Sequence, residues 1–176
     1  CKHIMALLAN GGPPQTVIAP RHATKKRERD DNEFECALAE KWTTEDPNGY
    51  YMSEKLDGMR CLWDGSALRT RNGNHIFAPE QLTQELPLLP LDGELFLGRG
   101  MFQKCMSVVR NHDADVNAWK DVRFMVFDAP SIKKPFGDRL NAAKVAVNNT
   151  SWAKVHDHSI CTGRDHLFEA LDAVLQ

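Results

Sequence analysis

The sequence lacks long apolar segments and has no surplus of positive charge. None of its hydrophobic runs approaches the roughly 18 consecutive apolar residues that a membrane-spanning helix needs. Lysine and arginine together number 22, against 24 aspartates and glutamates, which gives a net charge of −2. Stand-alone nucleic-acid binders usually have a basic isoelectric point, so any contact with nucleic acid must come from a local basic face. We therefore expect a soluble protein that does not enter a membrane.

Cysteine is also sparse, and its distribution argues against two common kinds of structural site. The five cysteines are widely spaced, and no C-x-x-C pair occurs among them. This distribution is typical neither of a disulfide framework nor of a zinc site, and it favours an intracellular protein, whether nuclear, organellar or viral. The histidines of His156-x-His158 could share one face of a strand, but we interpret them as a surface pair and not as metal ligands.

The chain divides into a lead and one domain. Residues 1–32 contain Gly11-Gly12-Pro13-Pro14 and mixed charges at residues 21–31, without a sustained hydrophobic period, so we expect a disordered or irregular lead. Residues 33–176 are long enough for one domain with a real core, since 42% of the sequence is hydrophobic.

Hydrophobic periodicity predicts a mixed fold. Strands are expected at residues 50–56, 59–63, 67–71, 91–97, 122–128 and 155–161, and helices at residues 33–42, 79–86, 102–111, 139–147 and 164–175. Asp64-Gly65 and Asn72-Gly73 are strong signals for tight hairpins, which pair strands antiparallel. We therefore predict an α+β fold of antiparallel sheets with flanking helices.

The segment Lys55-Leu56-Asp57-Gly58-Met59-Arg60 combines an amine, a carboxylate and a guanidinium around one glycine. A lysine amine is a nucleophile only when deprotonated, and a nearby cation such as Arg60 or partial burial favours that form. Gly58 allows the backbone to approach a ligand closely. The segment therefore suits a lysine that attacks a phosphoryl group, with Arg60 available to the phosphate or the sugar. A charged turn on a solvated face is the alternative.

Further motifs follow in order, namely Arg71-Asn72-Gly73, Leu91-Asp92-Gly93-Glu94-Leu95, Gly98-Arg99-Gly100 and Val126-Phe127-Asp128. The set resembles the covalent nucleotidyltransferases, the superfamily of ATP-dependent DNA ligases, RNA ligases and mRNA capping enzymes. Lys55-x-Asp57-Gly58-x-Arg60 resembles motif I, Asp92-Gly93-Glu94 resembles motif III, and Phe127-Asp128 resembles motif IIIa. Residues 53–60, 70–73 and 93–102 look most like the small, minimal DNA ligases.

The resemblance implies a role for each of these residues. Lys55 would be the catalytic nucleophile that carries AMP. The nucleotide would be bound by Glu54, Lys55, Arg60, Glu94 and Phe127, with Glu94 on a ribose hydroxyl and Phe127 stacked on adenine. The nicked DNA would be contacted by Asp57, Arg71 and Asp92. Taken singly, Glu94 could equally be a strand carboxylate, Asp92 a residue that caps the strand entry, Arg71 a solvent-facing turn residue, and Phe127 a core residue.

The resemblance also implies the reactants. ATP would be the substrate that leaves AMP on the lysine, Mg²⁺ the metal cofactor, and nicked double-stranded DNA the partner of a monomeric enzyme. The expected parent is an ATP-dependent DNA ligase that seals nicks in DNA repair, replication and recombination. An RNA ligase or an mRNA capping nucleotidyltransferase is one alternative, and a non-catalytic truncated remnant is another.

Motifs IV and V of the resembled enzymes do not follow Phe127. The sequence contains neither the E-G motif that is tied to metal binding nor the K-x-K motif that holds the phosphates, and no OB-fold domain follows. We therefore expect residues 33–176 to form the N-terminal part of an incomplete nucleotidyltransferase (adenylation) domain of ATP-grasp-like ligase type. No metal ligand is certain, because the main glutamate ligand is expected beyond Gln176. We also expect the apolar face of residues 122–127 to lie partly open and the isolated chain to be inactive.

Overall fold

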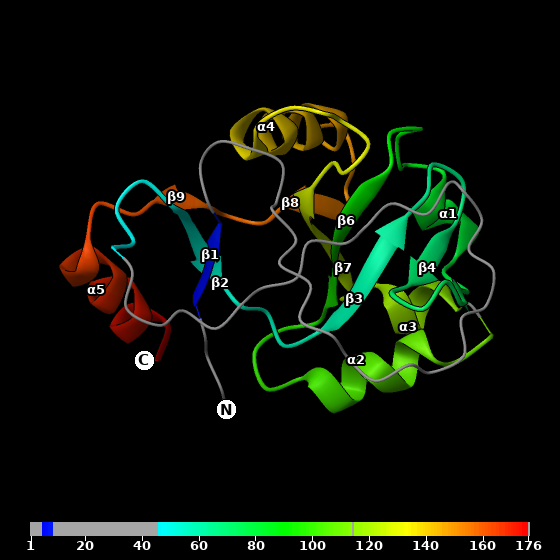
Figure 1. Cartoon of the computed structure of the whole chain (residues 1–176). Helices are drawn as coiled ribbons and strands as arrows, with labels where there is room; N and C mark the ends of the chain where they lie inside the picture. Colours follow the sequence, from blue (N-terminus) through cyan, green and yellow to red (C-terminus); the bar gives the residue numbers. More distant parts are fainter. Residues whose placement is uncertain (1–4, 9–45, 114, 176) are drawn as a thin grey trace, which may run out of the picture.

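The computed structural model describes residues 5–8, 46–113 and 115–175, which form two sheets with helices packed against them (Figure 1). The small sheet is antiparallel and has the order β1 (Met5–Leu8), β2 (Tyr51–Glu54), β9 (Ser159–Ile160). The large sheet has the order β5 (His75–Ile76), β4 (Leu68–Thr70), β3 (Met59–Trp63), β6 (Leu91–Phe96), β7 (Arg123–Asp128), β8 (Ala153–Val155). This arrangement confirms the α+β prediction.

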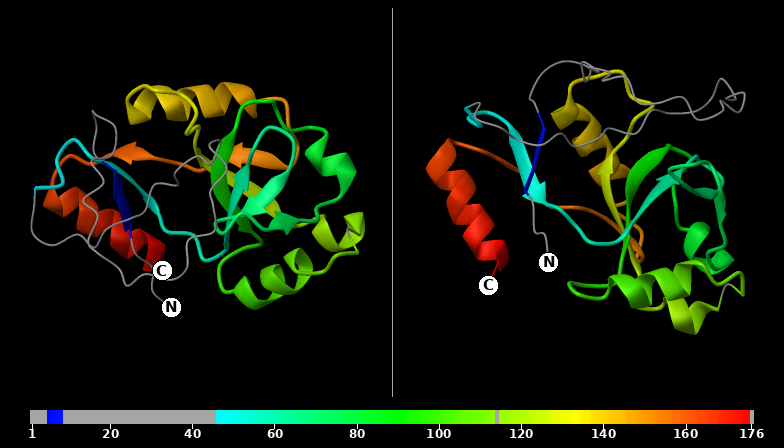
Figure 2. Two further views of the ribbon diagram at one scale, coloured as in Figure 1. Left: turned by 45° about the vertical axis from the view of Figure 1, so that its right-hand side comes forward. Right: turned by 60° about the horizontal axis from the view of Figure 1, so that its bottom comes forward.

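The helices are distributed over both sheets. They are α1 (Glu80–Thr83), α2 (Phe102–Val109), α3 (Val116–Trp119), α4 (Phe136–Ala146) and α5 (Arg164–Leu175). Helices α2 and α3 lie on one side of the large sheet, α4 packs on β7 and β8, and α5 lies beside the small sheet (Figure 2). None of the described helices has both the length and the apolar character needed to cross a membrane.

Strand β6 shows how the large sheet separates its core from its polar face. Successive side chains along a strand point to opposite faces. Leu91 and Leu95 therefore share one face and are completely buried in the main hydrophobic cluster, together with Cys105 of α2 and Trp119 of α3. Asp92 and Glu94 alternate with these leucines and so belong to the other face of the sheet, which carries the candidate site.

The expectation that residues 122–127 present a partly open apolar face is wrong. Val122, Phe124 and Val126 are each 0% exposed. Strand β7 is paired on both edges, with β6 and β8, and the rings of Phe124 and Trp152 have centroids 6.0 Å apart. The described residues therefore enclose this strand without a further sheet.

Residues 155–161 do not form the single strand that we expected. Ala153–Val155 form β8 in the large sheet, and Ser159–Ile160 form β9 in the small sheet, so the chain crosses between the sheets at residues 156–158. Strands β7 and β8 are also parallel, in contrast to the antiparallel pairing expected throughout. A parallel pair needs a crossover connection, and α4 supplies it.

The remaining differences concern short elements. Met5–Leu8 form β1, although they fall within the lead that we expected to be disordered or irregular, because they pair with β2. The rest of that lead and the helix expected at residues 33–42 lie outside the described residues. The sequence reading did not predict β5 or α3, and α4 begins at Phe136, before the expected start, because Pro135 is suited to a helix entry.

Candidate active site

Residues 55–58 connect the last residue of β2 in the small sheet to the first residue of β3 in the large sheet. Leu56 is buried, whereas Lys55 and Asp57 on either side of it are exposed. The apolar side chain thus anchors the link, and the predicted nucleophile is presented at the junction of the sheets.

Motif I contacts motif III directly through Gly58 and Glu94. The Gly58 N–H donates to Glu94 Oε1 at 2.8 Å. A Cβ atom on Gly58 would collide with the Leu95 carbonyl oxygen and would lie 2.9 Å from Cγ of Glu94. A glycine is therefore required here for close approach between the two motifs.

The Glu94 carboxyl lies within the electrostatic influence of both cations of motif I. Burial is the largest effect and raises its pKa above the ordinary value, while the Gly58 N–H and the charges of Lys55 and Arg60 act in the opposite direction. The arrangement can offer a hydrogen-bond acceptor to a polar ligand beside a lysine and an arginine, as predicted for the ribose contact.

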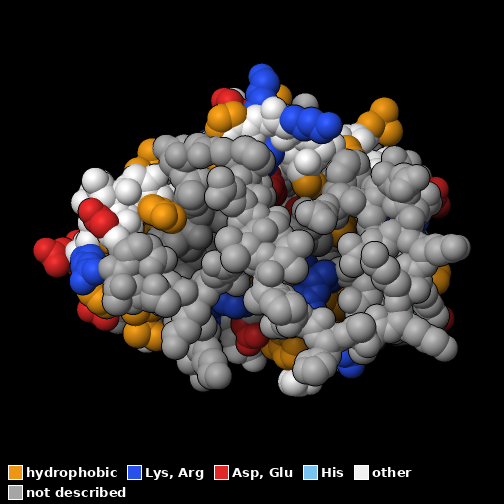
Figure 3. Space-filling view, viewed as in Figure 1, with side chains coloured by type: hydrophobic (Ala, Val, Ile, Leu, Met, Phe, Trp, Pro, Cys, Tyr) orange, Lys and Arg blue, Asp and Glu red, His pale blue; other side chains and the backbone are white. Residues whose placement is uncertain are grey.

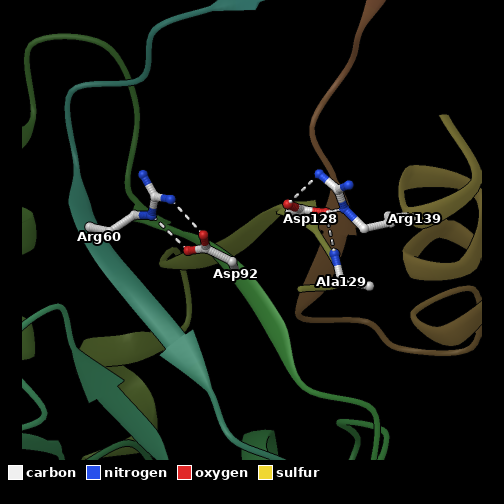
Figure 4. A network of polar contacts seen from close by, with 5 residues as sticks. All are labelled: Arg60, Asp92, Asp128, Ala129 and Arg139. Carbon is white, nitrogen blue, oxygen red and sulfur yellow. Dashed lines mark hydrogen bonds and ion pairs between the residues drawn. The ribbon is translucent and has the colours of Figure 1, made fainter. Parts of the chain in front are cut away.

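Arg60 and Asp92 form a two-point ion pair (Figure 4). Arg60 Nε lies 2.6 Å from Asp92 Oδ1, and Nη2 lies 2.5 Å from Oδ2. The side chain of Asp92 is only 1% exposed. Burial raises the pKa of Asp92, and the Arg60 guanidinium opposes that shift. Asp92 thus orients Arg60, whereas its predicted contact with nicked DNA stays a prediction.

Phe127 lies on the same side as Arg60, at a bulge in β7. Asp92 pairs with Asp128 and Gly93 pairs with Val126, so Phe127 is an extra residue between these pairs. Such a bulge re-aims side chains next to it. The Arg60 Cζ lies 4.5 Å from the centre of the Phe127 ring. The guanidinium therefore covers one face of the ring, and the stacking of adenine on Phe127 stays a prediction.

A second ion pair, between Asp128 and Arg139 of α4, was not foreseen from the sequence. Arg139 Nε and Nη2 lie 2.7 and 3.1 Å from the two Asp128 oxygens, and the Ala129 N–H donates to Oδ1 at 2.8 Å (Figure 4). The side chains of Arg139 and Asp128 are 11% and 7% exposed. A buried aspartate needs a cation as its partner. The position of Asp128 at the end of an apolar strand is therefore the feature of the sequence that could have indicated this ion pair.

Glu54, directly before Lys55, is held by the glycine-flanked Arg99. Arg99 Nε and Nη2 lie 2.9 and 3.0 Å from the Glu54 oxygens. Basic and acidic side chains lie next to one another near the centre of this face of the molecule (Figure 3). Arg71 is exposed in the turn between β4 and β5, which fits both a solvent-facing turn residue and a residue that contacts DNA, so the DNA contact stays a prediction.

The interpretation of His156 and His158 as a surface pair is wrong. His156 is only 8% exposed, and its Nε2 lies 2.8 Å from the carbonyl oxygen of Glu54. His158 Nδ1 lies 2.7 Å from the His156 carbonyl oxygen, and burial lowers the pKa of His158. Both histidines therefore pack where the chain crosses between the sheets.

The described residues do not provide a Mg²⁺ site. Among them, no group of three or more histidine, cysteine, aspartate or glutamate side chains could hold a metal ion. The buried carboxylates are instead engaged, Asp92 by Arg60, Asp128 by Arg139, and Glu94 Oε1 by the Gly58 N–H.

Comparison with known proteins agrees with this geometry, although no protein-family model matches the chain. A DNA ligase of Haemophilus influenzae is 30% identical over 128 residues, which cover 72% of this chain and 47% of that ligase. A solved Lig E DNA ligase, described as binding DNA with a minimal scaffold, matches 72% of this chain and 51% of its own with 38% identity and a TM-score of 0.67. The chain spans about half the length of these relatives. By sequence and by fold, this chain is therefore similar to the DNA ligases of the minimal type over 72% of its length.

Proposed function

We propose that this chain is the nucleotide-binding part of an ATP-dependent DNA ligase that seals nicks through a lysine–AMP intermediate. The observation that carries the proposal is the hydrogen bond of 2.8 Å between Gly58 of motif I and Glu94 of motif III. This contact brings Lys55 and Arg60 beside a carboxylate on one polar face, where a nucleotide could be held and attacked.

In the first step, the neutral Lys55 amine attacks the α-phosphorus of ATP. A nitrogen–phosphorus bond forms, the bond from the α-phosphorus to the bridging oxygen breaks, pyrophosphate leaves, and the amine loses its proton. The attack requires the deprotonated amine, because an ammonium group has no lone pair to donate. Glu94 would accept from a ribose hydroxyl, and Phe127 would stack on the base, a contact of about 1–3 kcal/mol by analogy with base stacking on aromatic side chains.

In the second step, an oxygen of the nick 5′-phosphate attacks the AMP phosphorus and releases Lys55. In the third, the 3′-hydroxyl attacks the activated 5′-phosphate, seals the strand and expels AMP. Arg71 and Asp57 are both exposed and would contact the DNA around the nick. Nick sealing of this kind serves DNA repair, replication and recombination. We assign no step to Mg²⁺, because the described carboxylates do not fit a metal site.

The test is incubation of the full-length ligase with radiolabelled ATP, followed by a denaturing gel. The wild type is expected to form a labelled adduct that the Lys55→Ala variant lacks, while Lys120→Ala, an exposed lysine after α3, serves as the control and keeps the label. Label that survives Lys55→Ala, or no label on the wild type, overturns the proposal. Competition by GTP would indicate a capping enzyme, and preference for a nicked RNA duplex would indicate an RNA ligase.

The same gel tests the 176-residue chain alone. Removing one electrostatic group from an active site typically costs about 10²–10³ in rate. The sequence contains neither motif IV nor motif V, so we expect its adduct yield to be far below that of the full-length ligase. Equal yields would show that the residues on the polar face of the large sheet are sufficient.

A further inference from the structure

We propose that His156 is a positioning residue for adenylation, which fixes the backbone that carries Lys55 against the nucleotide-binding strand β7. This inference rests on the proposed function and deepens it. His156 is not one of the motif residues and does not contact the reacting atoms; it acts through its neighbours.

The argument begins with the two hydrogen bonds of His156. Its backbone N–H donates to the carbonyl oxygen of Val126 in β7 at 2.7 Å, directly before Phe127. Its ring Nε2 lies 2.8 Å from the carbonyl oxygen of Glu54 in β2, directly before Lys55. One residue therefore joins the neighbour of the nucleophile in the small sheet to the neighbour of the predicted adenine-stacking residue in the large sheet.

The acceptor of this hydrogen bond determines which tautomer the His156 ring adopts. A carbonyl oxygen can only accept, so His156 Nε2 must carry the proton and donate it to Glu54. The same argument applies to His158, whose Nδ1 donates to the His156 carbonyl oxygen at 2.7 Å. The ring of His158 packs against Phe136 of α4, with centroids 5.4 Å apart, so His156 is held in turn by a half-buried neighbour.

This link matters because the connection that carries Lys55 from β2 to β3 is irregular. Residues 55–58 belong to no strand, and Lys55 and Asp57 point to solvent. The position of Lys55 relative to the large sheet therefore depends on the contacts that hold Glu54. The ring of His156, directly after β8, makes one of these contacts through its hydrogen bond to the Glu54 carbonyl oxygen. A misplacement of only about 1 Å can lower the rate of an attack about 10²-fold.

The inference predicts that rate and affinity respond separately. Phe127, Glu94 and Arg60 all stay on the large sheet when the His156 bond is lost, so ATP should bind nearly as before. The attack by Lys55 should slow, because the amine is no longer held in line with the α-phosphorus. A residue with a merely structural role would weaken binding and rate together.

The experiment measures single-turnover adduct formation at saturating ATP and the dissociation constant of ATP in the full-length ligase. His156→Leu removes the donor at similar volume, and we expect its rate to fall about 10- to 100-fold with an ATP dissociation constant within about twofold of the wild type. His156→Gln supplies an amide N–H at a comparable reach, and we expect it to recover most of the rate. The control is His166→Leu, because the ring of His166 bonds to Thr162, directly before its own helix, and not to the strand that leads to Lys55.

Three results would overturn the inference: a wild-type rate for His156→Leu, equal losses for His156→Leu and His156→Gln, or a parallel loss of affinity and rate. If His156→Leu does not fold, His156→Asn replaces it, since its shorter amide should be slower than His156→Gln, and equal rates for these two contradict the inference. A wild type without adduct would instead refute the proposed function itself.

Discussion

Two carboxylates face each other across the junction of β6 and β7, and each has its own arginine. Asp92 and Asp128 are paired residues in the register of these strands and are both buried. Asp92 is held by Arg60, and Asp128 is held by Arg139. A buried carboxylate without a partner is costly, so the two arginines offset the cost of burying these acids side by side.

Loss of Arg139 should therefore destabilise the protein strongly. Arg139→Met leaves the Asp128 carboxylate buried without its cation, and we expect the free energy of unfolding to fall by about 3–5 kcal/mol. Urea denaturation of the purified chain measures this change. The double variant Asp128→Asn/Arg139→Met removes the unpaired charge and should regain part of the loss. A double variant that is no more stable than the single one contradicts this explanation.

At the scale of residues, the ordered motifs indicated which segments come close together but not how their side chains pair. Glu94 does approach motif I, through Gly58. The partner of Arg60, by contrast, is Asp92, which lies 32 residues away along the chain. Such a contact depends on the register of β3 against β6, which cannot be derived from local composition.

At the scale of elements, the close approach of β6 and β7 depends on Gly93. A Cβ atom there would collide with the carbonyl oxygen of Met125 and would lie 2.7 Å from Cε2 of Phe124, both in β7. The ring of Phe124 is fully buried and has no free space to move into. The two strands must therefore separate if this position carries a side chain.

Gly93→Ala should consequently lower the free energy of unfolding by about 1–3 kcal/mol, the usual cost of overpacking a core. Ser107→Ala, an exposed position of α2, is the control and should change stability by no more than about 0.5 kcal/mol. Thermal denaturation of both variants checks the difference. A Gly93→Ala variant as stable as the control would mean that β6 and β7 can separate without loss.

Elements with a clear hydrophobic period were predicted well, and elements made by tertiary contacts were not. Met59–Trp63 and Arg164–Leu175 match the expected ranges. The division of residues 153–160 between β8 and β9 was missed because its cause is the buried His156, which bonds to Val126 and Glu54. The two residues of β5 and the four of α3 are too short to show a period.

At the scale of the whole molecule, buried ionisable groups link stability to pH in opposite directions. Burial lowers the pKa of His158 below its ordinary value of 6.5, so the unfolded chain binds a proton more readily than the folded one. Its contribution to stability is present above that value and is lost as the pH falls. Burial raises the pKa of Asp92 and of Glu94, so their contributions increase as the pH falls through the acidic range.

His158→Asn isolates the histidine contribution, because the asparagine amide can donate to the same carbonyl oxygen but does not titrate. We expect the stability of the wild type relative to this variant to decrease between about pH 8 and pH 5.5, since the ordinary histidine pKa of about 6.5 lies in that range. Urea denaturation of both proteins at several pH values measures the difference in their free energies of unfolding. The contributions of Asp92 and Glu94 cancel in this difference because both proteins contain them. Parallel pH profiles for the two proteins would contradict it.

The extra residue in β7 also bears on how this strand can change in evolution. Before the bulge, Phe124 and Val126 pack in the core. From the bulge onward, Phe127 contacts Arg60 and Asp128 pairs with Arg139. Without the bulge, strict alternation would turn the aspartate toward the apolar layer. The bulge thus separates the core residues of β7 from its site residues. Substitutions that repack Phe124 and Val126 therefore need not alter the contacts of Phe127 and Asp128 with the two arginines.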